Sequence, residues 1–472
     1  MAAFPRVQAR RITEGGVLDG RRSSAYDSLM PIRRYGTFTG GIDLPDETHW
    51  TRDQSVAACH SLERLWAPLS PFGGEPAEPI VREGQYVSHG QRIARAAGAG
   101  GVDIFAPLAG RIAGRTTAPV AGPQGVTTSE ALELVDLGDP PGIHPPEELY
   151  EWRAADPDSL RHRIAESHVT AHRRRPIALW RWIHRAREAR CSILIANVME
   201  NEPYVTTQHR LLAERGPEVV RGLTLLAKAL EIRSVILAVD RRWTDYYRET
   251  VAPSRLHGIT DVALPHKYPG GDDVMLVKVL TRRATPPGRG PMAVGAAVTD
   301  AATCFAVYRA VACEQPPTGR IVTVSGERID RPAMLYVPFG ARCSEIARGT
   351  APPLLHGGPM TGLPCGDRMV VGPATDAVLA IDTAEAVSPG PCIRCGWCTD
   401  HCPTRLNVAL LNDAFELGQV DRAERLGVAA CIGCGVCSYV CPARLPLTER
   451  MKRLRRGVKT QHLVEAGGGA HG

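Results

Sequence analysis

The sequence contains few aromatic residues and no long apolar stretch. Phenylalanine, tryptophan and tyrosine together make up 5% of the 472 residues, and a net charge of +6 is spread along the chain. A nucleic-acid-binding surface usually combines clustered basic residues with stacking aromatic residues, so this class of partner is not expected. The apolar runs at 193–196 and 235–239 are far shorter than the roughly 20 residues that span a bilayer. We therefore expect no transmembrane segment.

The sequence also lacks an export signal and the cysteine spacing of secreted, disulfide-bonded proteins. The pairs Arg10-Arg11 and Arg21-Arg22 are not followed by an apolar segment, so we expect a cytoplasmic location. Of the 14 cysteines, eight lie within residues 392–441 at spacings typical of metal ligands rather than of secreted disulfides. We interpret the other six as small buried apolar side chains in a reducing compartment; they are Cys59, Cys191, Cys304, Cys313, Cys343 and Cys365.

The eight clustered cysteines form two runs with one spacing, Cys-x-x-Cys-x-x-Cys-x-x-x-Cys-Pro. Three thiolates at this interval can bind three irons of one 4Fe-4S cluster, while the fourth cysteine, which precedes a proline, is directed toward the other cluster. The ligand sets are therefore expected to cross. We expect cluster 1 to be held by Cys392, Cys395, Cys398 and Cys441, and cluster 2 by Cys431, Cys434, Cys437 and Cys402.

Two zinc sites are the alternative interpretation of the cysteine runs, because zinc also binds thiolates. Zinc sites usually use two separated Cys-x-x-Cys pairs, so the third cysteine of each run favours iron and sulfide. Arg394, Asp400 and His401 occur only in the first run, which predicts that the two clusters differ in reduction potential.

Apolar and turn residues divide the rest of the chain into segments. Residues 1–50, rich in arginine, glycine and turn formers, predict an extended lead-in. Short apolar runs separated by turns predict a β domain at 51–140. Strand-like runs at 192–196, 234–239 and 275–279, which alternate with helical patterns, predict an α/β domain at 141–315. The remaining expected segments are a β-rich module at 316–350, a linker at 351–385, a helical cysteine domain at 386–455 and a flexible tail at 456–472. We interpret the basic run at 452–456 as a solvated helix end.

Several motifs, in this order, resemble RnfC, one of the proteins of the Rnf electron-transport complex. Phe38-x-Gly40-Gly41 and the glycine- and proline-containing motifs at 76–110 resemble the family's opening segment and its barrel-sandwich hybrid domain, which is similar to lipoyl carriers. The hairpin tip between Gly90 and Ala106 has no lysine, so we interpret this domain as structural.

The later motifs extend this resemblance to most of the chain. Asn-x-x-Glu-x-Glu-Pro-Tyr at 197–204 and Lys-Tyr-Pro-x-Gly at 267–271 are similar to the family's α/β domain, which is related to the flavin-binding subunit of complex I. Residues 320–326 resemble its ubiquitin-like SLBB module, and Gly-Gly-Pro-Met-x-Gly at 357–362 matches the run that precedes the clusters. The resemblance implies a multidomain α/β plus β fold that ends in a helical two-cluster ferredoxin domain.

One departure from the family affects the expected cofactors. In the family the α/β domain opens with a glycine-rich loop whose bare backbone lets FMN and nucleotide phosphates approach. The corresponding stretch here, 169–176, is Val-Thr-Ala-His-Arg-Arg-Arg-Pro and contains no glycine, although the three arginines could hold a phosphate. Glu200 and Glu202 match acidic residues that lie beside FMN in the family; without a flavin they would be vestigial residues at a strand end.

We expect the chain to relay electrons through two 4Fe-4S clusters, with FMN possible but its NADH step in doubt. The resemblance implies a peripheral subunit on the cytoplasmic face of the inner membrane, docked on other subunits of a membrane redox complex and exchanging electrons with ferredoxin or a similar carrier. No catalytic side chain is expected, because the cofactors carry the chemistry. Two alternatives remain, a soluble flavin and iron–sulfur reductase resembling cobalamin reductase, and a non-redox scaffold with structural clusters.

Overall fold

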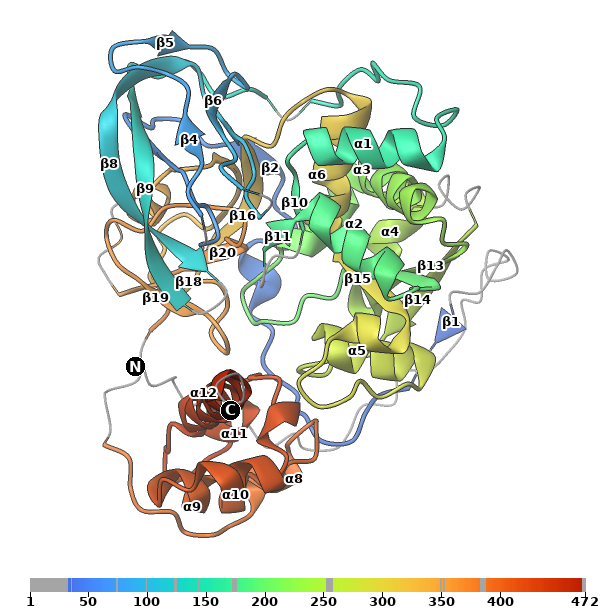
Figure 1. Cartoon of the computed structure of the whole chain (residues 1–472), viewed down its shortest axis with the longest axis vertical. Coiled ribbons are helices and arrows are strands. Elements are labelled where there is room, and N and C mark those ends of the chain that lie inside the picture. Colours follow the sequence, from blue (N-terminus) through green and yellow to red (C-terminus); the bar gives the residue numbers. More distant parts are fainter. Residues whose placement is uncertain are drawn as a thin grey trace, which may run out of the picture.

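The computed structural model describes residues 33–468 except 35, 74, 99, 123–124, 143, 172–175, 252–257, 349, 351–352 and 383–387. Figure 1 shows three bodies: β-rich layers at the upper left, an α/β domain at the right and a helical cysteine domain at the bottom. The expected lead-in lies largely outside the described residues. Within those residues, no helix combines the length and the apolar character that crossing a bilayer requires.

The α/β domain is built on a parallel sheet in the order β1-β14-β13-β12-β15. Its strands are β12 (Ile193–Asn197), β13 (Ser234–Asp240), β14 (Ile259–Leu264), β15 (Ala296–Asp300) and the short β1 (Arg33–Arg34). Parallel strands are covered on both faces, which explains their continuous apolar runs. The covering helices are α1 (Pro157–Glu166), α2 (Leu179–Glu188), α3 (Thr207–Leu230), α4 (Thr244–Val251), α5 (Asp273–Thr281) and α6 (Ala301–Ala312).

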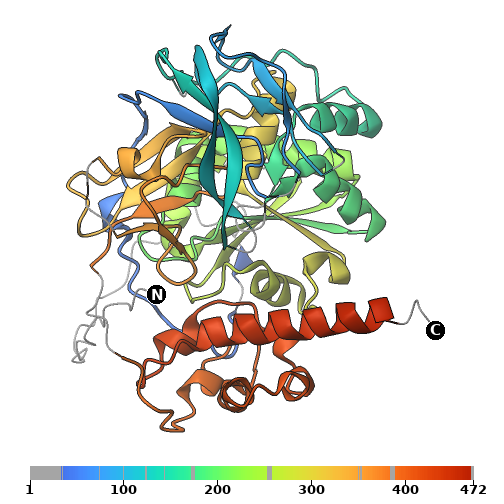
Figure 2. The ribbon, with the colours of Figure 1, turned by 60° about the vertical axis from the view of Figure 1, so that its left-hand side comes forward.

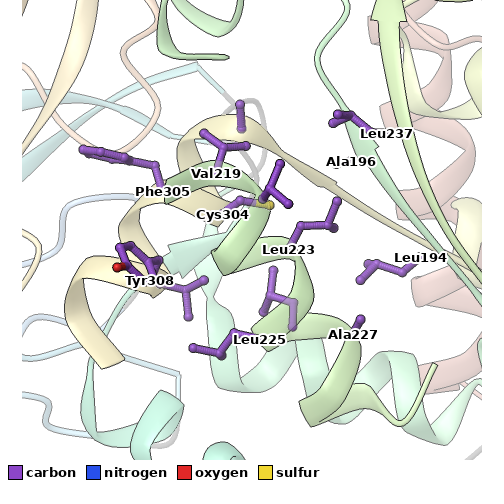
Figure 3. Close-up of a cluster of buried hydrophobic side chains, with 14 of the residues drawn as sticks. Leu194, Ala196, Val219, Leu223, Leu225, Ala227, Leu237, Cys304, Phe305 and Tyr308 are labelled. Atoms are coloured by element: carbon purple, nitrogen blue, oxygen red, sulfur yellow. The ribbon is translucent and has the colours of Figure 1, made fainter. Parts of the chain in front are cut away.

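The core of this domain lies where α3 and α6 pack against the sheet. Figure 3 shows Leu223 and Val219 of α3 beside Cys304 and Phe305 of α6, with Leu194 of β12 close by. Four of these five side chains are fully buried, and Phe305 is 7% exposed. The apolar residues whose spacing predicts a helix in this segment are therefore the residues that α3 buries against its neighbours.

The β-rich layers begin with the expected small β domain. One sheet has the order β3-β9-β8-β5 and the other β4-β6-β7. Their bounds are β3 (Leu65–Pro68), β4 (Glu78–Pro79), β5 (Tyr86–Val87), β6 (Arg92–Arg95), β7 (Ile104–Phe105), β8 (Gly110–Gly122) and β9 (Gly125–Val135). Leu65, Val87, Ile93 and Leu134, which are completely buried, lie in the core between the two sheets.

A third β layer draws on segments that are far apart in the sequence. Its order is β19-β18-β20-β16-β17-β2, and β16 pairs antiparallel with β17 as the expected strand, turn and strand. Part of the segment expected as a linker contributes strands to this sheet. The elements are β2 (Val56–Ala58), β16 (Gly319–Ser325), β17 (Ala333–Pro338), α7 (Cys343–Ile346), β18 (Leu354–His356), β19 (Leu363–Cys365) and β20 (Ala377–Leu379).

The cysteine domain is helical, as expected. It contains α8 (Trp397–Asp400), α9 (Val408–Glu416), α10 (Val420–Arg425), α11 (Val436–Tyr439) and α12 (Leu447–Gly468). The helix α12 runs through most of the segment expected to be a flexible tail, and Figure 2 shows it extending along the side of the domain that faces the α/β domain. Leu454 and Val458 are buried in the domain core, and His462 pairs with Glu424, which explains why the helix continues.

A strap at 36–44 fastens the cysteine domain to the α/β domain. The Gly41 N–H donates to the carbonyl of His401 at 2.8 Å, and Ile42 forms a backbone bridge with Tyr268. Gly40 has φ +81°, and a Cβ placed there would lie 2.6 Å from the carbonyl oxygen of Cys402. The close approach of strap and cysteine domain therefore requires glycine.

Replacing Gly40 by alanine should loosen this attachment. The clash and the left-handed backbone together should cost about 1–3 kcal/mol. We expect a lower melting temperature and faster release of the cysteine domain in limited proteolysis, both measured anaerobically. Gly36→Ala is the matched control, because a Cβ there meets nothing within 4 Å. Equal behaviour of the two variants would contradict a role for the strap.

Candidate metal centres and the adjoining cleft

The cysteines of the two runs line two separate small cavities. One cavity is lined by Cys392, Cys395, Cys398 and Cys441, with Ile393, Leu445 and Leu447 among its apolar walls. The other is lined by Cys402, Cys431, Cys434 and Cys437, with Val408 and Met451. Each run thus contributes three cysteines to one cavity and its fourth cysteine to the other. The cavities bring together the two crossed sets expected from the sequence.

Local structure positions the sulfur atoms of the second set. The backbone N–H of Gly433 donates to the sulfur of Cys431, and that of Leu406 to the sulfur of Cys402, each at 3.4 Å. Such N–H donors stabilise negative charge on a thiolate and tune a bound cluster. Burial raises the pKa of the Cys437 thiol to about 12 and also raises the pKa of Cys431. These thiols therefore require a bound cation to be held as thiolates at neutral pH.

The described cysteines fit a multi-iron group better than single ions. Thiolates bound to one zinc would lie about 4 Å apart, given Zn–S bonds of about 2.3 Å. In the part of the chain that the structure describes, no three His, Cys, Asp or Glu side chains converge closely enough to hold one metal ion. A cubane attaches each thiolate to a different iron and so holds the sulfur atoms further apart.

The equivalent positions of the two runs differ in burial. Trp397 is 53% exposed, whereas Val436 at the same position of the second run is fully buried. Arg394 adopts a left-handed backbone with φ +55°, where the second run has Gly433 with φ +70°. This conformation costs a non-glycine residue about 1–2 kcal/mol.

The second run also makes contacts that the sequence did not predict: the Tyr268 hydroxyl donates to the carbonyl of Cys434 at 2.5 Å.

Arg455 is a second residue near the cysteines that sequence reasoning missed. Its guanidinium donates to the carbonyl of Cys431 at 2.5 Å. It lies in the basic run at 452–456, so the interpretation of this run as a solvated helix end does not hold for Arg455. The spacing of α12, which places Arg455 four residues after the buried Met451 and so on the same face of the helix, was the signal available in the sequence.

A cleft of about 1480 Å³ opens beside the second set, between the β-rich layers, the α/β domain and the cysteine domain. Asn197 and Asp300, at the carboxyl ends of β12 and β15, line it, and so do Cys431 and Ile432. Because β13 and β15 lie on opposite sides of β12, this is the point where the strand order reverses, the usual ligand site of such sheets.

The two glutamates of the acidic motif bind the chain's own backbone. Glu200 accepts hydrogen bonds from the backbone N–H groups of Gln208 and His209, the latter at 3.1 Å, and so caps the start of α3. Glu202 accepts from the N–H of Met360 at 2.8 Å and from the hydroxyl of Thr361 at 2.5 Å. Both carboxylates are buried. These hydrogen bonds to the chain's own backbone were not anticipated from the sequence.

Two helix starts that line the cleft, those of α5 and α6, are capped in the same way, whereas the start of α2, beside Ile177 and Arg181, has no side-chain cap. Asp272 accepts from the N–H of Val274 at 3.0 Å at the start of α5, and Asp300 accepts from the N–H of Thr303 at 2.7 Å at the start of α6. A phosphate would need such N–H groups and would meet a carboxylate instead. Asp272 and Asp300 therefore disfavour a phosphate at the starts of α5 and α6. The arginines at 173–175 lie outside the described residues.

Glu202→Ala should destabilise the chain because it leaves the N–H of Met360 and the hydroxyl of Thr361 without their acceptor. A cost of about 1–3 kcal/mol should lower the melting temperature by about 2–8 °C. Glu78→Ala, at an exposed position of β4, is the control and should melt like the wild type. An unchanged melting temperature combined with loss of bound flavin would instead assign the Glu202 carboxylate to a flavin.

Three family models match successive parts of the chain. They are the RnfC barrel-sandwich hybrid domain at 36–131, the Nuo51 FMN-binding domain at 178–309 and the 4Fe-4S dicluster domain at 386–442. The matches confirm the expected barrel-sandwich, complex I-like α/β and dicluster domains. Among solved structures, an NAD+-reducing NiFe-hydrogenase in the H2-reduced state is 17% identical, with a TM-score of 0.44. The match covers 65% of this chain and 61% of the hydrogenase chain.

Curated relatives match most of the chain. The RnfC protein of the ion-translocating oxidoreductase complex of Rhodobacter capsulatus is 33% identical over 413 residues, which are 85% of this chain and 79% of the relative. Its counterpart from Pasteurella multocida is 28% identical over 78% of this chain, which spans 45% of that relative. With the crossed cysteine cavities and the order of the matched domains, these similarities show that the chain belongs to the RnfC family of ion-translocating oxidoreductase complexes.

Proposed function

We propose that this chain transfers electrons, one at a time, through two 4Fe-4S clusters as the RnfC component of a membrane-bound ion-translocating oxidoreductase complex. Cys392, Cys395, Cys398 and Cys441 hold cluster 1, and Cys431, Cys434, Cys437 and Cys402 hold cluster 2. The observation that carries the proposal is the pair of cavities, each lined by four cysteines in the crossed arrangement. The match to a 4Fe-4S dicluster domain supports it.

The chain's own residues position and tune the two centres. Each bound cluster supplies one-electron redox chemistry. Gly433 and Leu406 direct N–H groups at sulfur in the second set, and Arg455 binds the backbone beside Cys431. In the first set, Arg394 is 74% exposed and Cys392 is exposed. The second set is therefore the inner centre beside the cleft, and the first set is the outer one.

We infer that Glu200 and Glu202 act as structural caps and not as flavin ligands. Both accept backbone N–H groups of the chain, and the starts of α5 and α6 carry the caps Asp272 and Asp300. A flavin-containing reductase remains the second candidate, because a cleft of about 1480 Å³ lies at the switch point of the sheet. Flavin content distinguishes the two candidates.

The domain boundaries, partners and location are part of the same proposal. We assign 51–140, 141–315 and 386–455 to the three matched domains, and the sheet around β16 and β17 to an SLBB-like module that begins at 316. The partners are other subunits of the membrane complex and ferredoxin or a similar carrier. The chain would sit on the cytoplasmic face of the membrane.

Anaerobically purified protein should contain about eight irons and about eight sulfides. Cys395→Ser and Cys434→Ser should each lose about half of the iron and one of two EPR signals after reduction, because they alter different sets. Cys191→Ser, outside both sets, is the control and should keep the full iron content. Two bound zinc ions, or loss of neither EPR signal, would contradict the proposal. One flavin per chain would favour the second candidate.

A further inference from the structure

The two cysteine runs share a local conformation but differ in what covers them. Gly396 and Gly435 have φ angles of +82° and +87°, and each precedes a four-residue helix, α8 or α11. The second run is attached to the body of the chain through the side chain that follows its glycine, Val436. This side chain is buried in an apolar cluster with Leu44, Tyr268 and Met360. One copy of the repeat thus already serves as a docking surface within the chain.

The first run presents the equivalent surface to solvent. Trp397 takes the place of Val436 and is 53% exposed, and Ile393 is 64% exposed. Leu417, also 64% exposed, follows Asp413 by one helical turn, and the Asp413 carboxylate lies 3.4 Å from Arg394. We call Ile393, Arg394, Trp397 and Leu417 the first-run face. Exposed apolar side chains grouped in this way are typical of interaction sites.

Arg394 places a guanidinium on this face at the expense of backbone strain, with the Asp413 carboxylate 3.4 Å away. Its φ of +55° is one that the second run provides with Gly433, so the fold itself does not require an arginine. The side chain is 74% exposed. Strain that persists at one copy of a repeat, beside a candidate redox centre, points to a function of the side chain.

We propose that the first-run face binds a small acidic iron–sulfur carrier protein. The inference rests on the proposed function, since the cavity beneath the face is lined by the first cysteine set. An apolar centre beside the exposed guanidinium of Arg394 fits an acidic partner with a small apolar contact area, the form of transient redox interfaces. A second copy of this chain is the less favoured occupant, because the chain has a net charge of +6.

The test measures binding and not electron transfer. Full-length, anaerobically purified protein is titrated with an oxidised acidic ferredoxin carrying two 4Fe-4S clusters, by calorimetry at about 0.05 M and about 0.5 M salt. Arg394→Glu and Trp397→Ala should each raise the Kd about tenfold at low salt. The loss from Arg394→Glu should shrink at high salt, whereas the loss from Trp397→Ala should persist.

Three further variants separate docking from other effects. Arg394→Gly copies the second run, so it should melt no lower than the wild type and still bind about threefold more weakly. Asp400→Asn removes an exposed acid of the first run and should tighten binding. Arg405→Glu is the matched control: Arg405 is exposed and has φ +63°, but follows Cys402 of the other set. It should change the Kd less than about twofold.

The results distinguish failure of this inference from failure of the proposed function. Iron content and the EPR signals are measured on the same samples. Full iron content with no ferredoxin binding, or equal losses for Arg394→Glu and Arg405→Glu, would overturn the docking inference and leave the proposed function intact. Self-association that Trp397→Ala abolishes would assign the face to a second copy and overturn it as well. Protein without iron would overturn both.

Discussion

The exchange of the fourth cysteine between the two runs is the constraint on which the cysteine domain depends. Cys441 belongs to the cavity of the first run and Cys402 to that of the second, so neither set is complete without the other. The distance between the runs is fixed by α9, α10 and α12, whose apolar side chains form one core with Cys402. The two centres are therefore parts of a single folding unit, and loss of its core would disturb both.

Attachment of this unit to the rest of the chain determines which centre lies inside. The strap at 36–44, Tyr268 and the loop at 357–362 all contact the second half of the unit or the end of the first run. Glu202 holds the same loop through Met360. The acidic motif at 197–204 thus helps to fasten the cysteine domain to the α/β domain.

Much of this organisation could be predicted from the sequence, and the rest depended on contacts between distant segments. The cysteine spacing is local information and predicted the sets that share each cavity. Apolar runs predicted the buried strands β12 and β13, but the third such run, at 275–279, lies in the helix α5, so that part of the prediction was wrong. Glu202, by contrast, pairs with a backbone N–H 158 residues away, which no local pattern reveals. The strands at 354–379 and the helix beyond residue 456 were missed because proline, glycine and charge are frequent there, while tertiary packing decides the outcome. Local spacing also could not predict that Trp397 is exposed and Val436 buried.

The wall shared by the cleft and the inner cysteine cavity has a thermodynamic consequence. Cys431 and Ile432 line both spaces. A molecule that binds at that wall with different affinity in the two oxidation states of the inner centre will favour one of them. By linkage, a change of oxidation state must alter the affinity for that molecule by the same factor. Binding of a ligand in the cleft and the oxidation state of the inner centre are therefore thermodynamically coupled.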